Sequence, residues 1–260
     1  VSSLVSAQSV VRYVRYQHDG EISYGIVKGT QIQQLSGDLF NGPKPTGKTV
    51  ALESVRILPV TNPSKVIAVG LNYRSHSGNS GAAAPSLFAK LPSSLVATNQ
   101  PIVIPRESGG VHYEGELVIV MGKRAKNVSV ADAPNYIFGV TAGNDVSERS
   151  WQGSDLQWLR AKASDTFAPV GPYIVTGLNY NNLMVTTRVN GKVMQQESTK
   201  MLIHPIAKIV SYLSRYVTLE PGDLIYTGTP GRTTTLKAGD VVEVEVEGVG
   251  ILRNPVVKER

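Results

Sequence analysis

Short apolar runs separated by turn-forming residues recur along this 260-residue chain, and they limit the folds that it can adopt. The strand-like runs lie at residues 110–122, 137–141, 173–175, 184–189, 223–226 and 241–246. Two segments look helical: residues 203–216 carry an apolar stripe, and residues 130–136 fit a short helical turn. We therefore predict a mainly β protein with a few helices, an α+β fold whose long irregular loops favour a closed or rolled sheet.

The N-terminal part of the chain differs from the rest. Between residues 10 and 35 apolar and polar residues alternate, which is typical of short antiparallel strands. Residues 41–47 and 59–63 are dense in turn formers. We therefore expect a small N-terminal β domain over residues 1–60 and a larger domain over residues 61–260.

Composition excludes several kinds of site and partner. The chain has no cysteine, so any metal must be held by oxygen or by one of four histidines. The apolar runs are too short to span a membrane and the N-terminus has no signal-like pattern, so we expect a cytosolic protein without a membrane partner. The net charge of +6 comes from scattered Lys and Arg residues. We therefore expect no nucleic-acid partner, although a basic surface attracts anionic substrates.

Two glutamates on one predicted strand are the first candidates for chemistry. Strand periodicity places His112, Glu114 and Glu116 on the same face. Asp145 follows the next apolar run, at a predicted strand end where functional side chains often lie. The two glutamates alone also fit a solvent-facing strand, but three clustered carboxylates repel one another unless a cation neutralises them. Because Mg²⁺ is bound by a few carboxylates, the three acids together predict a divalent-cation site.

Several motifs resemble, in order, those of the fumarylacetoacetate hydrolase family. The resemblance extends from about residue 65 to residue 254, and the segment before residue 60 resembles the variable N-terminal extension of such proteins. The motifs are Val69-Gly70-Leu71-Asn72-Tyr73-Arg74-Ser75-His76, Glu114-Gly115-Glu116-Leu117, Asn144-Asp145-Val146-Ser147-Glu148-Arg149, Lys162-Ala163-Ser164-Asp165-Thr166-Phe167 and Tyr226-Thr227-Gly228-Thr229-Pro230. The resemblance implies the family's mixed β-sandwich roll as a catalytic domain over residues 61–260, and a homodimer.

The resemblance also implies a role for each residue that matches a family motif. Glu114, Glu116 and Asp145 are expected to hold Mg²⁺ or Mn²⁺. Lys162 is expected to stabilise developing enolate charge or to move a proton, and His76 is the second catalytic candidate.

Four further residues are expected to bind the substrate, and two of them have a second interpretation. The four are Arg149, Gln152, Thr229 and Tyr73. A guanidinium suits a carboxylate, but Arg149 also fits a structural ion pair, and Tyr73 fits a buried core position equally well.

The function that these residues imply is chemistry on a small, enolisable 2-oxo acid through a metal-bound enolate. The branch of the family that the chain resembles includes 2-hydroxyhepta-2,4-diene-1,7-dioate isomerases, acylpyruvate hydrolases and oxaloacetate tautomerase-decarboxylases. Hydrolytic members carry a glutamate three positions after the histidine that matches His76, and here that position is Asn79. We therefore expect a tautomerase, isomerase or decarboxylase. The alternatives are an acylpyruvate C–C hydrolase and a ligand-binding protein of the same fold without catalysis.

Overall fold

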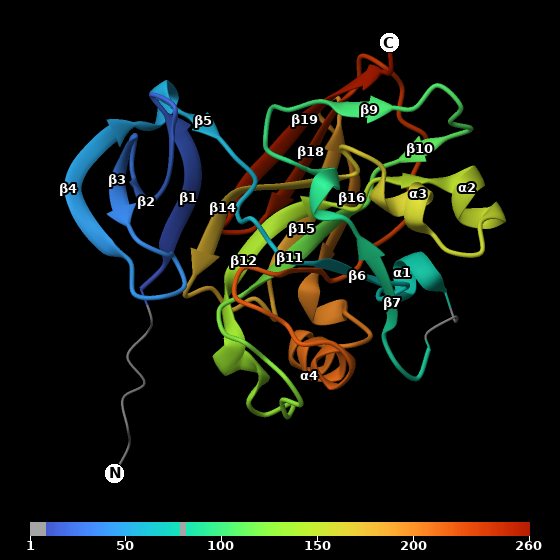
Figure 1. Ribbon diagram of the computed structural model, residues 1–260. Helices are drawn as coiled ribbons and strands as arrows, with labels where there is room; N and C mark the ends of the chain where they lie inside the picture. Colours follow the sequence, from blue (N-terminus) through green and yellow to red (C-terminus); the bar gives the residue numbers. More distant parts are fainter. Residues whose placement is uncertain (1–8, 79–81) are drawn as a thin grey trace.

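The computed structural model describes residues 9–78 and 82–260 and shows a molecule built mainly of strands (Figure 1). Within these residues the strands form a large mixed sheet, a five-stranded sheet and a two-stranded ribbon. The prediction of a mainly β fold with few helices is confirmed. None of the described helices is long and apolar enough to cross a membrane.

The large sheet is organised around β11 (Gly115–Met121), which is buried along its whole length. It pairs antiparallel with β12 (Ile137–Asn144) on one side and with β17 (Leu224–Tyr226) on the other. Successive side chains of β11 point to opposite faces, so Leu117 enters one hydrophobic core and Val118 enters a second. The other strands of this part are β6 (Val66–Gly70), β7 (Ser86–Lys90), β8 (Leu95–Val96) and β14 (Ala168–Thr176). Burial on both faces makes β11 a rigid support for residues at its ends.

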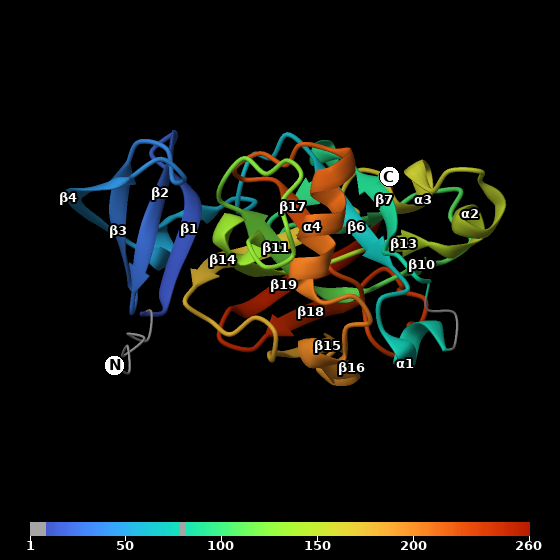
Figure 2. The ribbon, with the colours of Figure 1, turned by 90° about the horizontal axis from the view of Figure 1, so that it is seen from below.

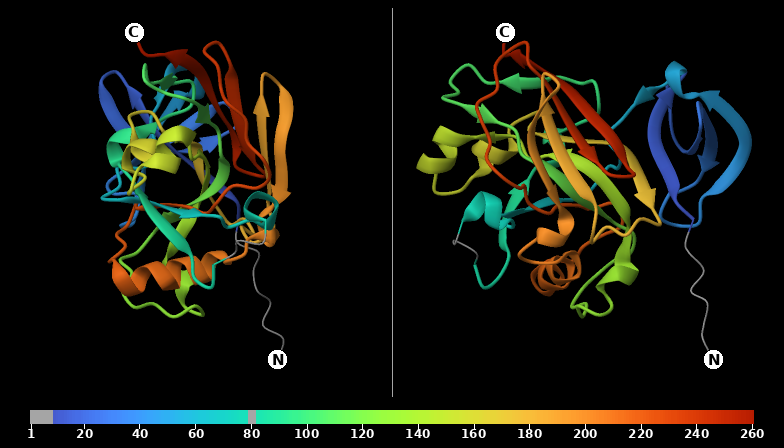
Figure 3. Two further views of the ribbon diagram at one scale, coloured as in Figure 1. Left: turned by 90° about the vertical axis from the view of Figure 1, so that its right-hand side faces the viewer. Right: turned by 180° about the vertical axis from the view of Figure 1, so that it is seen from behind.

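The five-stranded sheet lies over one face of the large sheet (Figures 2 and 3). In spatial order its strands are β16 (Lys192–Ser198), β15 (Met184–Val189), β18 (Val241–Val246), β19 (Gly250–Lys258) and β9 (Ile102–Ile104). The apolar face of α4 (Ile206–Tyr216) contributes Ile209 and Leu213 to the core between the sheets. The ribbon pairs β10 (Val111–His112) with β13 (Ser147–Glu148).

The N-terminal strands form a strongly curled antiparallel sheet at one side of the molecule, drawn in blue in Figure 1. They are β1 (Val11–His18), β2 (Glu21–Lys28), β3 (Gln31–Ser36), β4 (Lys44–Ala51) and β5 (Arg56–Ile57). The predicted meander is confirmed, but the turn prediction at residues 41–47 is wrong for its second half, because β4 begins there. Pro45 and Gly47 are tolerated because β4 is an edge strand, where no neighbour needs the missing proline N–H.

The helices other than α4 are short. They are α1 (Arg74–Ser77), α2 (Arg149–Ser154) and α3 (Leu159–Ala163), with 3-10 turns η1 (Leu52–Ser54), η2 (Pro92–Ser94), η3 (Ala133–Tyr136) and η4 (Thr199–Met201). The helix predicted over residues 203–216 is confirmed as α4, and the turn predicted over residues 130–136 is η3. Sequence analysis missed α1, α2 and α3, because four to six residues are too few for an apolar period to show.

Candidate metal centre

Three buried carboxylates meet where β11 begins and β12 ends. Glu114 precedes β11, Glu116 lies within it, and Asp145 directly follows β12. One oxygen atom of each carboxylate lies within 4.8 Å of the corresponding atoms of the other two. The structure therefore brings together the three residues that the sequence marked as candidate metal ligands.

Backbone geometry explains why these acids converge. The antiparallel register of β11 and β12 places Gly115 opposite Asn144, and the Asp145 N–H donates to the Glu114 carbonyl at 2.8 Å. Gly115 faces the second sheet so closely that a Cβ atom there would lie 1.9 Å from Thr187 Oγ1. A side chain is therefore excluded at Gly115, and the two flanking glutamates turn to the opposite side, towards Asp145.

The single strand predicted over residues 110–122 is wrong in its middle, because β10 ends at His112 and β11 begins at Gly115. The His112 ring nitrogens lie 2.9 Å from Thr233 Oγ1 and 3.1 Å from Thr235 Oγ1. His112 is thus held beside the acidic cluster by two threonine hydroxyls and is not one of its members.

Two buried lysines neutralise part of the cluster. Lys162 Nζ lies 2.7 Å from Glu114 Oε2 and 2.8 Å from Asp145 Oδ2, so its ammonium bridges two of the acids. Lys90 Nζ lies 2.5 Å from the second oxygen of Asp145 and also donates to the Lys162 carbonyl. Burial opposes the charged form of Lys162, but Asp145 and Glu114 raise its pKa above the ordinary value. Lys162 therefore stays a cation at neutral pH.

Glu114 has more basic neighbours than the other two acids of the cluster. Arg149 Nη2 lies 2.6 Å from Glu114 Oε1, and His76 Nε2 lies 3.7 Å from the same oxygen. Burial works to raise the pKa of Glu114, but Lys162, Arg149 and His76 together hold it well below its ordinary value. Glu114 is therefore a carboxylate at any physiological pH.

Glu116 is the exception in the cluster. Its Oε2 accepts from the Gly228 N–H at 2.7 Å, and among the described residues no lysine, arginine or histidine forms an ion pair with it. Gly228 adopts a φ of +107°, and a Cβ there would lie 2.7 Å from Asn72 Cβ, so only glycine presents this N–H to Glu116. Burial and the charges of Asp145 and Glu114 raise the pKa of Glu116 well above its ordinary value.

The donor set fits a hard divalent cation. Three carboxylates supply oxygen ligands, which Mg²⁺ and Mn²⁺ prefer, and the chain has no cysteine to supply a thiolate. Because Glu116 lacks a cationic partner, its negative charge in this buried site is not neutralised, and a bound divalent ion would neutralise it. Glu114, Glu116 and Asp145 are therefore the residues that would hold such an ion.

A small cavity of about 30 Å³ adjoins the cluster, which is room for one water molecule or ion. Gln152 and Thr229 line it, together with Lys162, His76 and the missed Trp158. The Thr229 hydroxyl donates to the Gly115 carbonyl at 3.0 Å.

Arg149 and Tyr73, the other two predicted substrate-binding residues, occupy different surroundings. Arg149 donates to Gln152 Oε1 at 2.7 Å as well as to Glu114, which matches its alternative interpretation as an ion-pair partner. Tyr73 is buried in the core between the sheets, which is the second of the two positions considered for it. Burial and the neighbouring Glu116 raise the pKa of the Tyr73 hydroxyl far above its ordinary value.

Other residues of the centre escaped sequence analysis. Lys90 is the last residue of β7, and a lysine at the end of a strand is usually solvent-exposed. The fold is needed to show that its side chain is buried. Glu148, in the same motif as Asp145, turns away from the cluster and accepts the N–H groups of Gly110 and Trp151 at 2.7 and 2.6 Å. Glu148 is thus the N-cap of α2. Asn79, which entered the prediction of reaction type, lies outside the described residues.

Two family models match the chain. Residues 65–257 match the fumarylacetoacetate (FAA) hydrolase C-terminal model, and residues 11–59 match the Rv2993c-like N-terminal model. Together they cover most of the chain, including the three acids of the candidate metal centre.

Solved structures and sequence relatives agree with these matches. The structure of a 2-hydroxyhepta-2,4-diene-1,7-dioate isomerase from Mycobacterium marinum superposes with a TM-score of 0.90 at 40% identity, covering 96% of this chain and 99% of that one. A maleylpyruvate hydrolase from Sphingobium sp. SYK-6, solved with manganese(II) and pyruvate, gives a TM-score of 0.82 at 28% identity over 96% of this chain and 100% of that one. The mitochondrial oxaloacetate tautomerase fahd2 of Xenopus laevis is 39% identical over 216 residues, which are 77% of this chain and 68% of the relative. The chain therefore belongs to the fumarylacetoacetate hydrolase family.

Proposed function

We propose that this protein is a divalent-cation-dependent tautomerase or isomerase of a small 2-oxo acid. The observation that carries the proposal is the unbalanced charge of Glu116, buried beside Glu114 and Asp145 and next to a cavity that the Lys162 ammonium also lines. Isomerase and tautomerase are the activities named for two of the relatives, and the third was solved with manganese and pyruvate, a 2-oxo acid. Mg²⁺ or Mn²⁺ is accordingly the proposed cofactor.

A bound divalent cation supplies positive charge beside the carboxylate and keto oxygens of a 2-oxo acid, which eases loss of a proton from the adjacent carbon. Lys162 is the residue placed to share this task. Its ammonium is held by Glu114 and Asp145 and its raised pKa keeps it charged, so it stabilises negative charge that develops on the substrate oxygen. Lys162 therefore stabilises negative charge electrostatically and does not act as a base.

His76 is the better candidate for moving the proton. Its Nδ1 lies 2.6 Å from the Gly231 carbonyl, which can only accept, so Nδ1 carries a hydrogen. Nε2 is therefore the ring nitrogen that can gain and lose a proton, and it lies 3.7 Å from Glu114 Oε1. His76 Nε2 takes the proton from the substrate carbon, and the same atom returns it to the oxygen or to another carbon.

Substrate recognition is assigned to Gln152 and Thr229, the two polar residues of the cavity that are not charged. Arg149 is proposed to reach the substrate carboxylate by exchanging one of its hydrogen bonds to Gln152 or Glu114. Because the cavity holds about 30 Å³, side chains around it must move to admit a 2-oxo acid. His76 lies on the short helix α1 and Trp158 directly precedes α3, and these are the residues that we propose to move.

Decarboxylation of a 2-oxo acid that carries a β-carboxylate shares the same developing charge and is the second reaction that we propose. Acylpyruvate hydrolysis is the alternative, because a maleylpyruvate hydrolase has the same fold. Hydrolysis also requires an activated water molecule, and Asn79 lacks the carboxylate that would orient His76 for that purpose. We further propose that the protein is a homodimer, which light scattering on the purified chain would test.

The deciding experiment is a substrate panel with Mg²⁺ or Mn²⁺ present. Oxaloacetate, a 2-hydroxydienoate and an acylpyruvate are incubated with the protein while enol absorbance and released CO₂ are followed. We expect tautomerisation or decarboxylation to exceed hydrolysis and to cease in EDTA. An acylpyruvate hydrolysis rate equal to the fastest of the other activities would favour the hydrolase, and activity unaffected by EDTA would contradict the role of the cation.

A further inference from the structure

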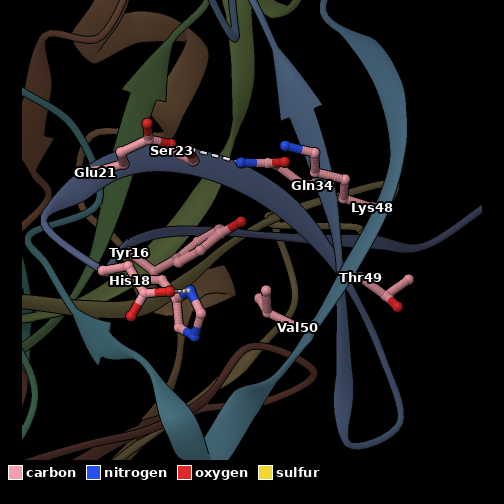
Figure 4. Close-up of a pocket in the computed structure, with 9 residues that line it drawn as sticks. Tyr16, His18, Glu21, Ser23, Gln34, Lys48, Thr49 and Val50 are labelled. Atoms are coloured by element: carbon pink, nitrogen blue, oxygen red, sulfur yellow. Dashed lines mark hydrogen bonds and ion pairs between the residues drawn. The ribbon is translucent and has the colours of Figure 1, made fainter.

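The curled N-terminal sheet encloses a second, much larger cavity at its open end (Figure 4). This N-terminal cavity measures about 400 Å³, within the range of roughly 300–1,000 Å³ that is usual for small-molecule sites. Its lining includes Tyr16 and Ser23 on the neighbouring strands β1 and β2, and Lys48 and Val50 on β4. None of these residues belongs to the acidic cluster, so the cavity is a separate feature of the molecule.

Tyr16 is the most informative residue of the N-terminal cavity. Its side chain is 1% exposed, and among the described residues its hydroxyl has no hydrogen-bond partner. Ser23, directly opposite on β2, accepts a hydrogen bond from Gln34 Nε2 at 3.1 Å. Figure 4 shows the Tyr16 hydroxyl directed into the space bordered by Ser23, Gln34 and Val50. Buried hydroxyls are normally paired, so this group calls for a partner that the described protein does not provide.

Opposite charges face each other across this cavity. Glu21 lies on β2 and Lys48 on β4, on either side of β3. Neither forms an ion pair within the described residues, whereas the adjacent Asp19 is paired with His18 at 3.3 Å. Lys48 is level with Gly25 of β2, two strand spacings or about 10 Å away, and Glu21 lies four residues further along β2. The two long side chains can therefore approach a ligand between them without touching each other.

We propose that the N-terminal cavity binds a small zwitterion with an ammonium and a carboxylate on one carbon, the chemistry of a free α-amino acid. Lys48 pairs with the carboxylate, Glu21 pairs with the ammonium, and the Tyr16 hydroxyl donates to a carboxylate oxygen. Val50 supplies an apolar contact for the ligand's side chain. A simple anion would be repelled by Glu21 and a simple amine by Lys48, so the charge pattern selects a molecule that carries both groups.

The binding test uses the full chain and requires no enzymatic activity. The twenty standard amino acids are screened by thermal shift, and any hit is measured by calorimetry beside acetate and ethylammonium chloride. We expect at least one amino acid to bind saturably and at least tenfold more tightly than either single-charge probe. The absence of saturable binding by all twenty, or equal binding of acetate or ethylammonium, would overturn the proposal.

Variants then locate the site. Tyr16→Phe keeps the ring and removes only the unpaired hydroxyl, so we expect about a tenfold loss of affinity with an unchanged melting temperature. Glu21→Gln and Lys48→Met should each weaken binding by at least as much, because each removes a charged partner. Lys44→Met and Glu53→Gln, outside the cavity, are the matched controls and should bind as the native protein does. Undiminished binding in all three cavity variants would contradict the assignment, as would an equal loss in the controls.

Discussion

Two lysine–aspartate pairs of nearly the same length differ in what else surrounds the carboxylate. Lys65 Nζ lies 2.6 Å from Asp223, just before β17, and Lys90 Nζ lies 2.5 Å from Asp145 in the acidic cluster. Asp223 also accepts from the backbone N–H groups of Ser64, Lys65 and Glu220 and from the Ser64 hydroxyl. Within the described part of the chain, the Asp145 carboxylate accepts from Lys90 and Lys162 and from no backbone N–H.

This difference distinguishes a structural carboxylate from one suited to bind a cation. Fixed backbone donors around Asp223 saturate its oxygens and tie two chain segments together. The ammonium groups beside Asp145 sit on long side chains, and Lys162 is shared with Glu114, so a stronger cation can compete with it for the same oxygens. Asp145 is thus a buried carboxylate whose hydrogen-bond partners a metal ion can displace, and a metal ligand needs both properties.

The largest expected effect separates these two pairs directly. Lys90→Met leaves a fully buried Asp145 with one cation fewer, so we expect a loss of about 3–5 kcal/mol in the free energy of unfolding. Lys65→Met should cost at most about 1 kcal/mol, because the Lys65 side chain is 31% exposed and Asp223 keeps four other donors. Urea unfolding in EDTA gives both values. Equal losses in the two variants would remove the distinction. Mg²⁺ should stabilise both variants, because both keep the three acids, but it should stabilise Lys90→Met by more.

Lys162→Met sharpens the comparison on the catalytic side. We expect turnover to fall by about a hundredfold or more, since the ammonium stabilises charge that appears along the reaction coordinate. Divalent-cation affinity should persist, because the variant removes a competing positive charge from Glu114 and Asp145. Steady-state rates and calorimetry with Mn²⁺ measure the two quantities. Unchanged turnover on every productive substrate would reduce Lys162 to a structural residue.

The pH dependence of stability offers a smaller effect. The unfolded chain releases the Glu116 proton near the ordinary carboxyl pKa of 4.5, whereas the folded protein keeps it to higher pH. The free energy of unfolding therefore falls as pH rises above 4.5, by at most about 1.4 kcal/mol per pH unit from this group. The lowered pKa of Glu114 has the opposite effect, because its charge stabilises the folded protein above the unfolded pKa. Glu114 is unchanged in the Glu116→Gln variant, so its contribution cancels when that variant is compared with the native protein.

Glu116→Gln isolates this contribution. In EDTA the variant should gain melting temperature relative to the native protein between pH 5 and pH 8, because the amide never ionises. A difference that stays constant over this range would mean that Glu116 is not an uncompensated buried acid.

Sequence periodicity predicted the parts of the fold that alternate or repeat clearly. The β1–β3 meander and α4 were both found this way, because each runs long enough for one face to be read. Only residues 173–175 of β14 were predicted, since Pro169, Gly171 and Pro172 look like strand breakers. The tertiary setting overrides that local signal, as β12 pairs with Val170, Gly171 and Val175 of β14.

The site was predictable where a motif or a carboxylate spacing marked it, as for Glu114, Glu116 and Asp145. Lys90 could not be predicted, because a lysine at the end of a short strand looks solvent-exposed until the fold buries it. The same limit applies to Glu148, which stands in the right motif but caps a helix too short to recognise in advance. A sequence shows which residue types are present, but segments far away in the chain determine whether a side chain is buried and what it hydrogen-bonds to.

The most direct test of the central claim is the melting temperature in EDTA followed by excess Mn²⁺ or Mg²⁺. For native protein at a hundred times the dissociation constant, binding only to the folded state predicts about 2.7 kcal/mol, or roughly 5–10 °C. Glu116→Gln should lose this rise, while Glu148→Gln, altered in a buried glutamate outside the cluster, should melt lower but respond to the ion normally. No rise in the native protein, or an equal rise in Glu116→Gln, would contradict the claim that Glu114, Glu116 and Asp145 hold a divalent cation.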